Sequence, residues 1–353
     1  MKDAMAEYPF LKGVPSYTDD YSLPKAFAYK ARNAFRFARD RSKAKLHAVS
    51  GSGPSTVAPT DLICLCTARN EMRFLPSFLK HYRSLGVDRF VFVDDGSEDG
   101  SVEFLSGQAD VDLYTSKLRF AEARRGRLWR EQLALSYGFD RWYINVDSDE
   151  YLIPPCNGKM DFKTYLRRIF GLNKRRIIAP MIDLYPIGSL SHAKFDAGSG
   201  GYPWDVADHF DRDGYRYERS ESGNISIYGG PRHRVFGVNA KLTKYPVLWW
   251  DSDTSLRKSI HAPDPSWRNS PTEWGVLLHF KIFSDLKQQV AAVVENRQHY
   301  DGASIYKQMQ DQMDTAMPES FEYNGSVHLK DMETLRSSGF LVSALDRGKD
   351  RTS

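Results

Sequence analysis

Three carboxylates lie within four positions in the segment "RWYINVDSDEYLIP", which spans residues 141–154. Apolar residues precede and follow the side chains of Asp147, Asp149 and Glu150, a pattern typical of a buried strand that ends in a polar cluster. In an extended segment residues i and i+2 point to the same side. Asp147 and Asp149 are therefore expected to face one site, while Glu150 points away from it.

Neighbouring buried carboxylates are costly unless a positive charge compensates them. A divalent cation, Mn²⁺ or Mg²⁺, prefers oxygen ligands and completes its shell with water and phosphate oxygens. The Asp-x-Asp pair of Asp147 and Asp149 is therefore a candidate metal site for a nucleotide diphosphate. The alternative is a solvated acidic turn, but the apolar Leu152 and Ile153 that follow favour the buried metal site.

The segment "DDGS", residues 94–97, also follows an apolar run. Asp94 and Asp95 can accept hydrogen bonds from ribose hydroxyls or a base N–H, and the glycine permits a tight turn. In the structural alternative Ser97 or Asp99 caps the next helix. That alternative leaves the paired aspartates unexplained.

The segment "TARNE", residues 67–71, follows an earlier apolar run. Arg69 is suited to phosphate contact or to stacking on a base. Asn70 is also a candidate helix N-cap, and both roles can hold at once.

The chain around these clusters alternates between short apolar runs and amphipathic segments. The expected strands are residues 61–68, 88–97, 111–115 and 141–147, and the expected helices are 70–86, a short helix through Val102 and Leu105, and 124–139. This alternation predicts an α/β protein with a Rossmann-like, mostly parallel sheet and helices on both faces. Right-handed crossovers place the C-terminal ends of such strands at one edge, so the three polar clusters should meet there.

The composition excludes several classes of protein. The 353 residues are 41% hydrophobic and 27% charged with a net charge of +4, which indicates a globular chain without a domain-wide nucleic-acid surface. Cys64, Cys66 and Cys156 are too few and too irregular for a disulfide framework or a zinc site, and a reducing compartment fits them. No apolar run reaches the roughly 20 residues of a membrane span, and the N-terminus lacks a secretory signal. We therefore expect a cytoplasmic protein.

The three clusters carry a resemblance to a known family. "ICLCTARNE", "FVFVDDGSEDGS" and "WYINVDSDEYLIP", in that order, resemble the family 2-type glycosyltransferases of the GT-A fold. The closer likeness is to a bacterial branch that is also similar to family 92, which "SLGVDRFVFVDDGSEDGS" matches well. The resemblance is specific over residues 62–154. It weakens beyond them, where "GGPRHRVFG", "LTKYP" and "LLHFK" still look like the branch.

This resemblance implies transfer of a sugar from a nucleotide-sugar donor to a hydroxyl of a carbohydrate or glycolipid acceptor, with Mn²⁺ or Mg²⁺ as cofactor. Asp147, Asp149 and His279 would hold the metal, with a histidine packed at a strand end as the alternative for His279. The residues implied in donor binding are Thr67, Arg69, Asn70, Glu71, Asp94, Asp95 and Ser97. Arg232 and Arg234 are suited to binding the donor diphosphate or an acidic acceptor. The bacterial branch further implies surface polysaccharide or glycoconjugate synthesis at the inner face of the cell membrane.

The resemblance also implies inversion at the anomeric carbon, which needs a carboxylate base on the acceptor side. No segment matches the family's base clearly, and six carboxylates are eligible by position: Asp183, Glu218, Glu221, Asp251, Asp253 and Glu273. Among them we select Asp183 and Glu218 as the candidate catalytic residues. The alternative functions are a nucleotidyltransferase-like enzyme, although the chain lacks a Gly-rich signature after its first strand, and an inactive nucleotide-binding scaffold.

We divide the chain into five regions. They are a basic N-terminal helical extension (1–47), a linker (48–60), the nucleotide-sugar-binding half of the GT-A domain (61–154), a looser acceptor-side half (155–283), and a C-terminal helical region and tail (284–353). In the later regions we expect strands within 241–250 and 274–283 and a helix over 284–300, capped by Ser284 or Asp285. Loops and short strands are expected over 184–237.

The N-terminal extension is strongly basic between residues 25 and 45. One interpretation is a helix packed on the main domain with a solvated basic face. The other is an amphipathic helix that makes peripheral contact with an anionic membrane.

Overall fold

The computed structural model describes residues 7–11, 39, 43–156, 160–196, 198, 200–220, 224–269, 272–296 and 303–345. The basic helix expected between residues 25 and 45 lies outside this part of the chain, apart from Arg39 and residues 43–45. Among the described residues, no helix is both long and apolar enough to cross a membrane.

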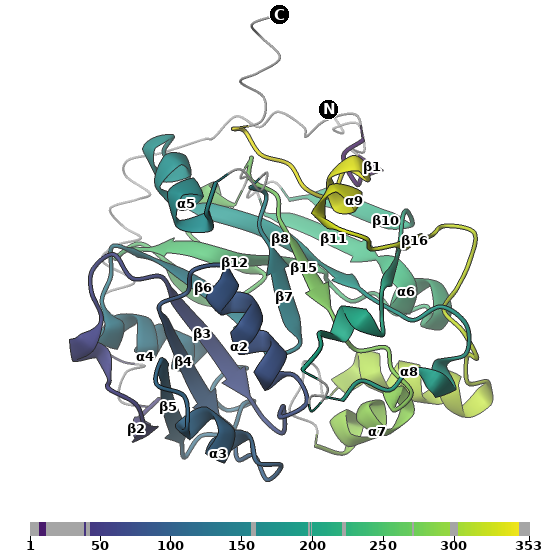
Figure 1. Cartoon of the computed structure of the whole chain (residues 1–353), viewed down its shortest axis with the longest axis horizontal. Helices are drawn as coiled ribbons and strands as arrows, with labels where there is room; N and C mark the ends of the chain where they lie inside the picture. Colours follow the sequence, from purple (N-terminus) through teal and green to yellow (C-terminus); the bar gives the residue numbers. More distant parts are fainter. Residues whose placement is uncertain are drawn as a thin grey trace, which may run out of the picture.

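A nine-stranded sheet forms the centre of the molecule, with the strand order β2-β5-β4-β3-β6-β12-β8-β15-β7 (Figure 1). Its strands are β2 (Leu46–Ser50), β3 (Ile63–Ala68), β4 (Arg89–Asp94), β5 (Val111–Ser116), β6 (Arg141–Asp147), β7 (Glu150–Ile153), β8 (Arg176–Asp183), β12 (Thr243–Trp250) and β15 (Val276–His279). The strands β3, β4, β5 and β6 pair in parallel, β15 is parallel to β8, and β2, β12 and β7 pair antiparallel with their neighbours. Six of the nine strands therefore run in one direction, which confirms the predicted α/β fold with a mostly parallel sheet.

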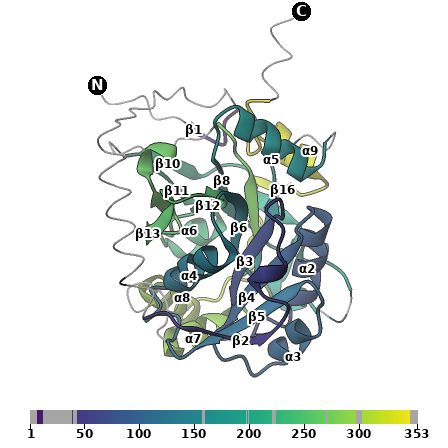
Figure 2. The same ribbon diagram turned by 90° about the vertical axis from the view of Figure 1, so that its left-hand side faces the viewer.

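Helices cover both faces of this sheet. They are α2 (Leu75–Ser84), α3 (Ser101–Ser106), α4 (Arg127–Tyr137), α5 (Phe162–Gly171), α6 (Gly230–Phe236), α7 (Leu286–Asn296), α8 (Ser304–Thr315) and α9 (Met332–Ser337). Figure 2 shows α2 and α4 on opposite sides of β3. The helices expected over 70–86 and 124–139 begin several residues later than predicted, because the residues before them form loops at the strand ends.

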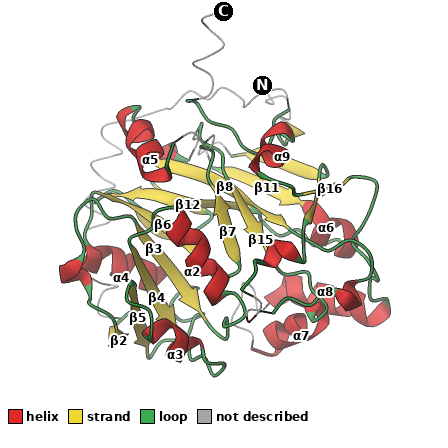
Figure 3. Cartoon of the chain, in the orientation of Figure 1, coloured by secondary structure: helices red, strands yellow, loops and turns green. Residues whose placement is uncertain are grey.

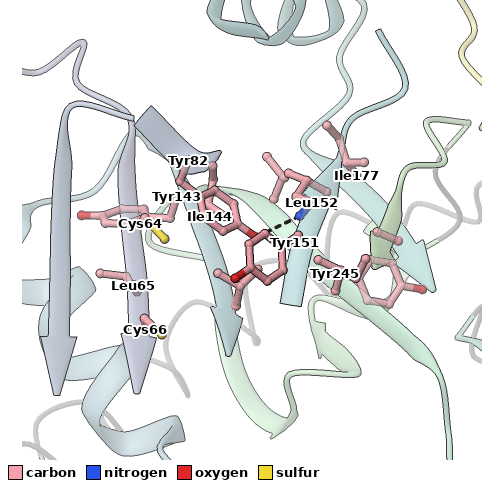
Figure 4. Close-up of a cluster of buried hydrophobic side chains, with 14 of the residues drawn as sticks. Cys64, Leu65, Cys66, Tyr82, Tyr143, Ile144, Tyr151, Leu152, Ile177 and Tyr245 are labelled. Carbon is pink, nitrogen blue, oxygen red and sulfur yellow. Dashed lines mark hydrogen bonds between the residues drawn. The ribbon is translucent and has the colours of Figure 1, made fainter. Parts of the chain in front are cut away.

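The predicted strands form the core because their side chains are apolar on both faces. All six residues of β3 are buried, and Cys64 and Cys66 pack there as small core side chains (Figure 4). The Tyr82 hydroxyl on α2 donates to the carbonyl oxygen of Glu150 at 2.9 Å and accepts from the N–H of Leu152 at 3.0 Å. This tyrosine therefore fixes the start of β7 against the core.

The later half contains several smaller sheets around the main one. They are the three-stranded sheet of β1 (Glu7–Tyr8), β10 (Tyr215–Arg219) and β11 (Ile225–Gly229), and the pairs β13 (Ser255–Ser259) with β14 (Ala262–Asp264) and β9 (His209–Asp211) with β16 (Ser326–His328). We expected loops and short strands over 184–237; β9, β10 and β11 are such strands, and the segment also contains the helix α6. Pro231 in its first turn suits a helix start, and the left-handed Gly237 ends it.

In the described C-terminal residues, the helices α7, α8 and α9 alternate with loops and the short strand β16. The helix expected over 284–300 begins at Leu286, directly after both proposed caps, and residues 297–300 lie outside the described part. Side chains from α6, α7 and α8 form a second apolar cluster beside the main core. Figure 3 shows these three helices gathered at one side of the sheet.

The expected linker at residues 48–60 is attached to the sheet. Residues 48–50 belong to β2, which pairs antiparallel with β5, and Pro54–Thr56 forms a 3₁₀ turn. The Asp112 carboxylate accepts a hydrogen bond from the N–H of Gly53 at 2.9 Å. This segment is therefore an edge strand followed by an anchored turn.

Candidate active site

The three polar clusters meet at one edge of the sheet, as the parallel topology requires. In the register of β3, Thr67 lies beside Asp147 of β6, and Ala68 lies beside Asp94 of β4. The loops that follow these strands therefore start side by side. This edge is where open α/β sheets bind ligands.

The Asp94 carboxylate holds the turn of the "DDGS" segment. It accepts hydrogen bonds from the N–H groups of Gly96, at 2.9 Å, and Ser97, at 3.1 Å. Gly96 has φ 82°, a left-handed conformation that glycine adopts without strain. Asp94 thus shapes the backbone of the candidate nucleoside site.

Asn70 and Ser97 fasten the first-strand loop to this turn. The Ser97 hydroxyl accepts from the N–H of Asn70 at 2.9 Å, and the Asn70 amide oxygen accepts from the N–H of Glu98 at 2.8 Å. Asn70 has φ 55° and lies in the loop before α2. Neither residue is the N-cap of the helix that follows it, since those caps are Phe74 and Gly100.

Asp95 is also buried in this turn, and two arginines face it. Its carboxylate oxygens lie 3.2 Å from Arg119 Nε and 3.8 Å from Arg69 Nη1. Burial raises the pKa of Asp95 to about 6, and the charge of Arg69 only partly opposes this. The arginines are themselves about half and one-third exposed, so both remain accessible to a ligand.

We expect Asp95→Asn to raise the free energy of unfolding at pH 7 by about 1 to 3 kcal/mol. The folded-state pKa of about 6 lies above the unfolded value of about 4. The carboxylate therefore destabilises the folded state progressively as the pH rises from about 4 to about 6, and the full effect is present at pH 7. Urea unfolding of both proteins at pH 7 and pH 4 checks this. The difference in free energy of unfolding between Asp95→Asn and wild type should be smaller at pH 4 than at pH 7. A difference of the same size at both pH values, or no difference at either, would contradict the prediction.

Asp147 ends β6 between two cations. Arg130 Nη2 and Lys244 Nζ each lie 2.7 Å from its carboxylate. Burial raises its pKa, but the charges of Lys244 and Arg130 outweigh burial and hold the pKa of Asp147 well below its usual range. Arg130 also donates to the Thr67 hydroxyl at 3.4 Å, which places the predicted Thr67 at the wall of the site.

The prediction that the Glu150 side chain points away from the site of Asp147 and Asp149 is wrong. The chain turns at Ser148 and Asp149, and β7 begins at Glu150, so the alternation of a single extended segment does not apply across the turn. The Glu150 carboxylate accepts from the N–H of Asp147 at 3.1 Å and pairs with the Lys244 ammonium. It is 1% exposed and belongs to the acidic cluster.

Asp149 faces a histidine that a second aspartate orients. His279 Nε2 lies 3.6 Å from Asp149 Oδ2, and His279 Nδ1 lies 2.5 Å from Asp183 Oδ1. Arg232 Nε donates to the other Asp183 oxygen at 2.8 Å. Lys281 makes an ion pair with Asp149.

The buried residues offer a chemically suitable metal site. Ligand atoms of Asp149, Glu150 and His279 all lie within 4.8 Å of one another. One nitrogen and two carboxylate oxygens suit Mn²⁺ and related divalent cations. Because the Asp183 carboxylate accepts a hydrogen bond from His279 Nδ1, the other ring nitrogen, Nε2, is the one available to bind a metal, as in many metal sites. Compared with the predicted set, Glu150 joins this group, and Asp147 is held by Arg130 and Lys244 instead.

Glu71 lies close to the same cluster. Burial raises its pKa to about 8, and the negative charge of Asp149 adds to this effect, whereas Lys281 and a hydrogen bond with Ser148 oppose it. The first-strand loop thus contributes a carboxyl group to the acidic site.

Two other predicted residues, Arg234 and Glu218, form ion pairs with residues outside this acidic cluster. Arg234 pairs with Asp211 at 2.9 Å and donates to the carbonyl oxygen of Phe321 at 2.7 Å, so it ties α6 to the C-terminal region. Glu218, about half exposed on β10, pairs with Arg216 at 2.8 Å. Glu221 lies outside the described residues.

Three cations of the site were not predicted from the sequence, namely Arg130, Lys244 and Lys281. Arg130 and Lys244 are almost fully buried. A lysine within the apolar segment "LTKYPVLWW" could have indicated one of them, because a buried ammonium needs a carboxylate partner. Its partner could not be read from the pattern, since Asp147 lies 97 residues away.

Comparisons with known proteins give one weak relative. No protein-family model matches the chain. A glycosyltransferase family 92 protein of Ricinus communis is 21% identical over 286 residues, which cover 69% of this chain and 51% of that protein. The chain thus spans about half the length of the curated relative it matches.

Two solved structures show distant likenesses to the chain. A UDP-glucose pyrophosphorylase complexed with UDP-glucose is 9% identical, covers 82% of this chain and 100% of its own, and has a TM-score of 0.21. The mannosyltransferase Ktr4p from S. cerevisiae is 10% identical over 54% of this chain and 56% of its own, with a TM-score of 0.22. Scores this low support no functional argument.

Proposed function

We propose that this chain is a glycosyltransferase that moves a sugar from a nucleotide-diphosphate sugar to an acceptor hydroxyl. The observation that carries the proposal is the convergence, at one sheet edge, of the Asp94–Asp95 turn with the buried group of Asp149, Glu150 and His279. The weak similarity to a family 92 glycosyltransferase supports the same reaction class. The family 2 assignment and a bacterial role in polysaccharide or glycoconjugate synthesis rest on the sequence resemblance and form part of the proposal.

Each side of the site suits one part of the donor. Arg69 and Arg119 lie beside Asp95, where they can contact a nucleoside or its phosphates. Lys281 is partly exposed at the acidic group and can reach a diphosphate. A divalent metal held by Asp149, Glu150 and His279 would neutralise negative charge on the leaving diphosphate.

Asp183 is better suited to positioning than to acting as the base. Burial raises its pKa, but Arg232 and His279 outweigh burial and lower the pKa of Asp183 to about 2. Both of its oxygens are engaged, by His279 and by Arg232. We therefore propose that Asp183 fixes the tautomer and orientation of His279, and that an inverting reaction uses another carboxylate as base, with Glu218 kept as the candidate.

A thermal-shift screen tests the proposed function. We expect one nucleotide sugar in a panel, at a hundredfold excess over its Kd with Mn²⁺, to stabilise the protein by about 2.7 kcal/mol, a rise in Tm on the order of 3–4 °C. EDTA should remove the shift, and the matching nucleoside without phosphates serves as the control. A panel in which no nucleotide sugar shifts Tm with Mn²⁺ or Mg²⁺ would overturn the proposal, and the nucleotidyltransferase and scaffold alternatives would then need separate tests.

A further inference from the structure

Lys281 and a metal ion would compete for the same carboxylate. Lys281 follows His279 by two residues, and both side chains face Asp149. The Lys281 ammonium pairs with Asp149 Oδ2, the same oxygen that lies 3.6 Å from His279 Nε2. This oxygen of Asp149 therefore cannot pair with the ammonium and bind a metal ion at the same time.

Lys281 is the cation of this cluster that can move away. Its side chain is 29% exposed, whereas those of Lys244 and Arg130 are 4% and 2% exposed. Lys244 is also held by two carboxylates, and Arg130 is held by Asp147 and the carbonyl oxygen of Val146. The flexible stem of a partly exposed lysine lets its ammonium follow a phosphate a few ångströms away.

We propose that Lys281 is the internal counter-ion of the metal site: its ammonium neutralises Asp149 in the free enzyme and shifts to the donor diphosphate when donor and metal bind. This inference rests on the proposed function and adds a coupling between two ligands. Metal alone must displace Lys281 without compensation. With donor present the displaced ammonium gains a phosphate partner, so each ligand strengthens binding of the other.

Calorimetry of Lys281→Met tests the exchange, with Lys281→Arg as the charge-retaining variant and Lys287→Met as the matched control. Lys287 pairs with Asp314 at the surface, and both side chains are about half exposed. Three titrations are made on each protein: Mn²⁺ alone, UDP or GDP alone, and the same nucleotide with Mn²⁺. Melting curves verify folding, and Lys281→Gln replaces the Met variant if that protein fails to fold.

The two affinities should change in opposite directions in Lys281→Met. Removing one positive charge beside the ligands should tighten binding of Mn²⁺ alone by about tenfold or more. Binding of UDP or GDP with Mn²⁺ should weaken by about tenfold, because a charge-assisted contact to phosphate is lost. The Arg variant should stay within about threefold of wild type for Mn²⁺, since it keeps the charge, and Lys287→Met should change neither affinity.

Other outcomes overturn the inference. Unchanged Mn²⁺ affinity in Lys281→Met would show that the lysine does not compete with the metal. A loss of both affinities in a folded variant would assign the lysine a structural role. Wild-type nucleotide binding that survives EDTA but is lost in Lys281→Met would mean that the lysine replaces the metal, and would also overturn the exchange. A wild-type protein that binds neither Mn²⁺ nor any nucleotide sugar would instead overturn the proposed function.

Discussion

Asp149→Ala is expected to abolish sugar transfer, lowering kcat/KM by at least about a thousandfold, or roughly 4 kcal/mol of transition-state stabilisation. Asp149 is the buried carboxylate that faces His279 and Lys281. Its loss removes one of the three atoms that could hold a divalent cation. We therefore also expect Mn²⁺-dependent binding of a nucleoside diphosphate to weaken by more than about tenfold.

Two comparisons separate this effect from general damage. Asp149→Asn keeps the size of the side chain and removes its charge, so it should show nearly the same loss of activity with less effect on stability. Glu103→Ala removes an exposed carboxylate on α3 and should leave activity and nucleotide binding unchanged. Unchanged UDP or GDP affinity in Asp149→Ala with Mn²⁺, measured by calorimetry against wild type, would contradict the metal assignment.

The sheet edge was predictable because its determinants are local in sequence. The apolar runs that form β3, β4 and β6 are long enough to identify as buried strands, and each ends in polar residues. Parallel topology then brings the strand ends together without further information. The observed register of Thr67 with Asp147 and of Ala68 with Asp94 agrees with that reasoning.

The internal electrostatics of the site could not be predicted in the same way. Glu150 was misplaced because the expected alternation assumed one continuous strand, whereas the chain reverses between β6 and β7. The cations come from α4, from β12 and from the residues after β15, and only tertiary packing brings them to the carboxylates. Asp183 and Arg232 were each predicted as site residues, but their ion pair was not, because 49 residues separate them in the sequence.

Lys244→Met is expected to lower the free energy of unfolding by about 3 to 5 kcal/mol. Lys244 is a buried cation that bridges Asp147 and Glu150, and it is 4% exposed. The methionine fills most of the volume but leaves Glu150 without its ammonium partner and close to the negative charge of Asp147. Urea unfolding at pH 7 measures the loss. Lys287→Met, at the exposed pair with Asp314, should change stability by less than about 0.5 kcal/mol.

A second substitution identifies electrostatics as the cause. Glu150→Gln removes one of the two carboxylates, so the double variant with Lys244→Met should be more stable than Lys244→Met alone, with a coupling energy above about 1 kcal/mol. Lower pH should act in the same direction, because burial already raises the pKa of Glu150 and loss of the Lys244 ammonium raises it further, so the folded state takes up a proton as the pH falls from 7 toward 5. A loss no larger than that of Lys287→Met, or one that neither Glu150→Gln nor lower pH reduces, would show that Lys244 does not stabilise the acidic cluster through its charge.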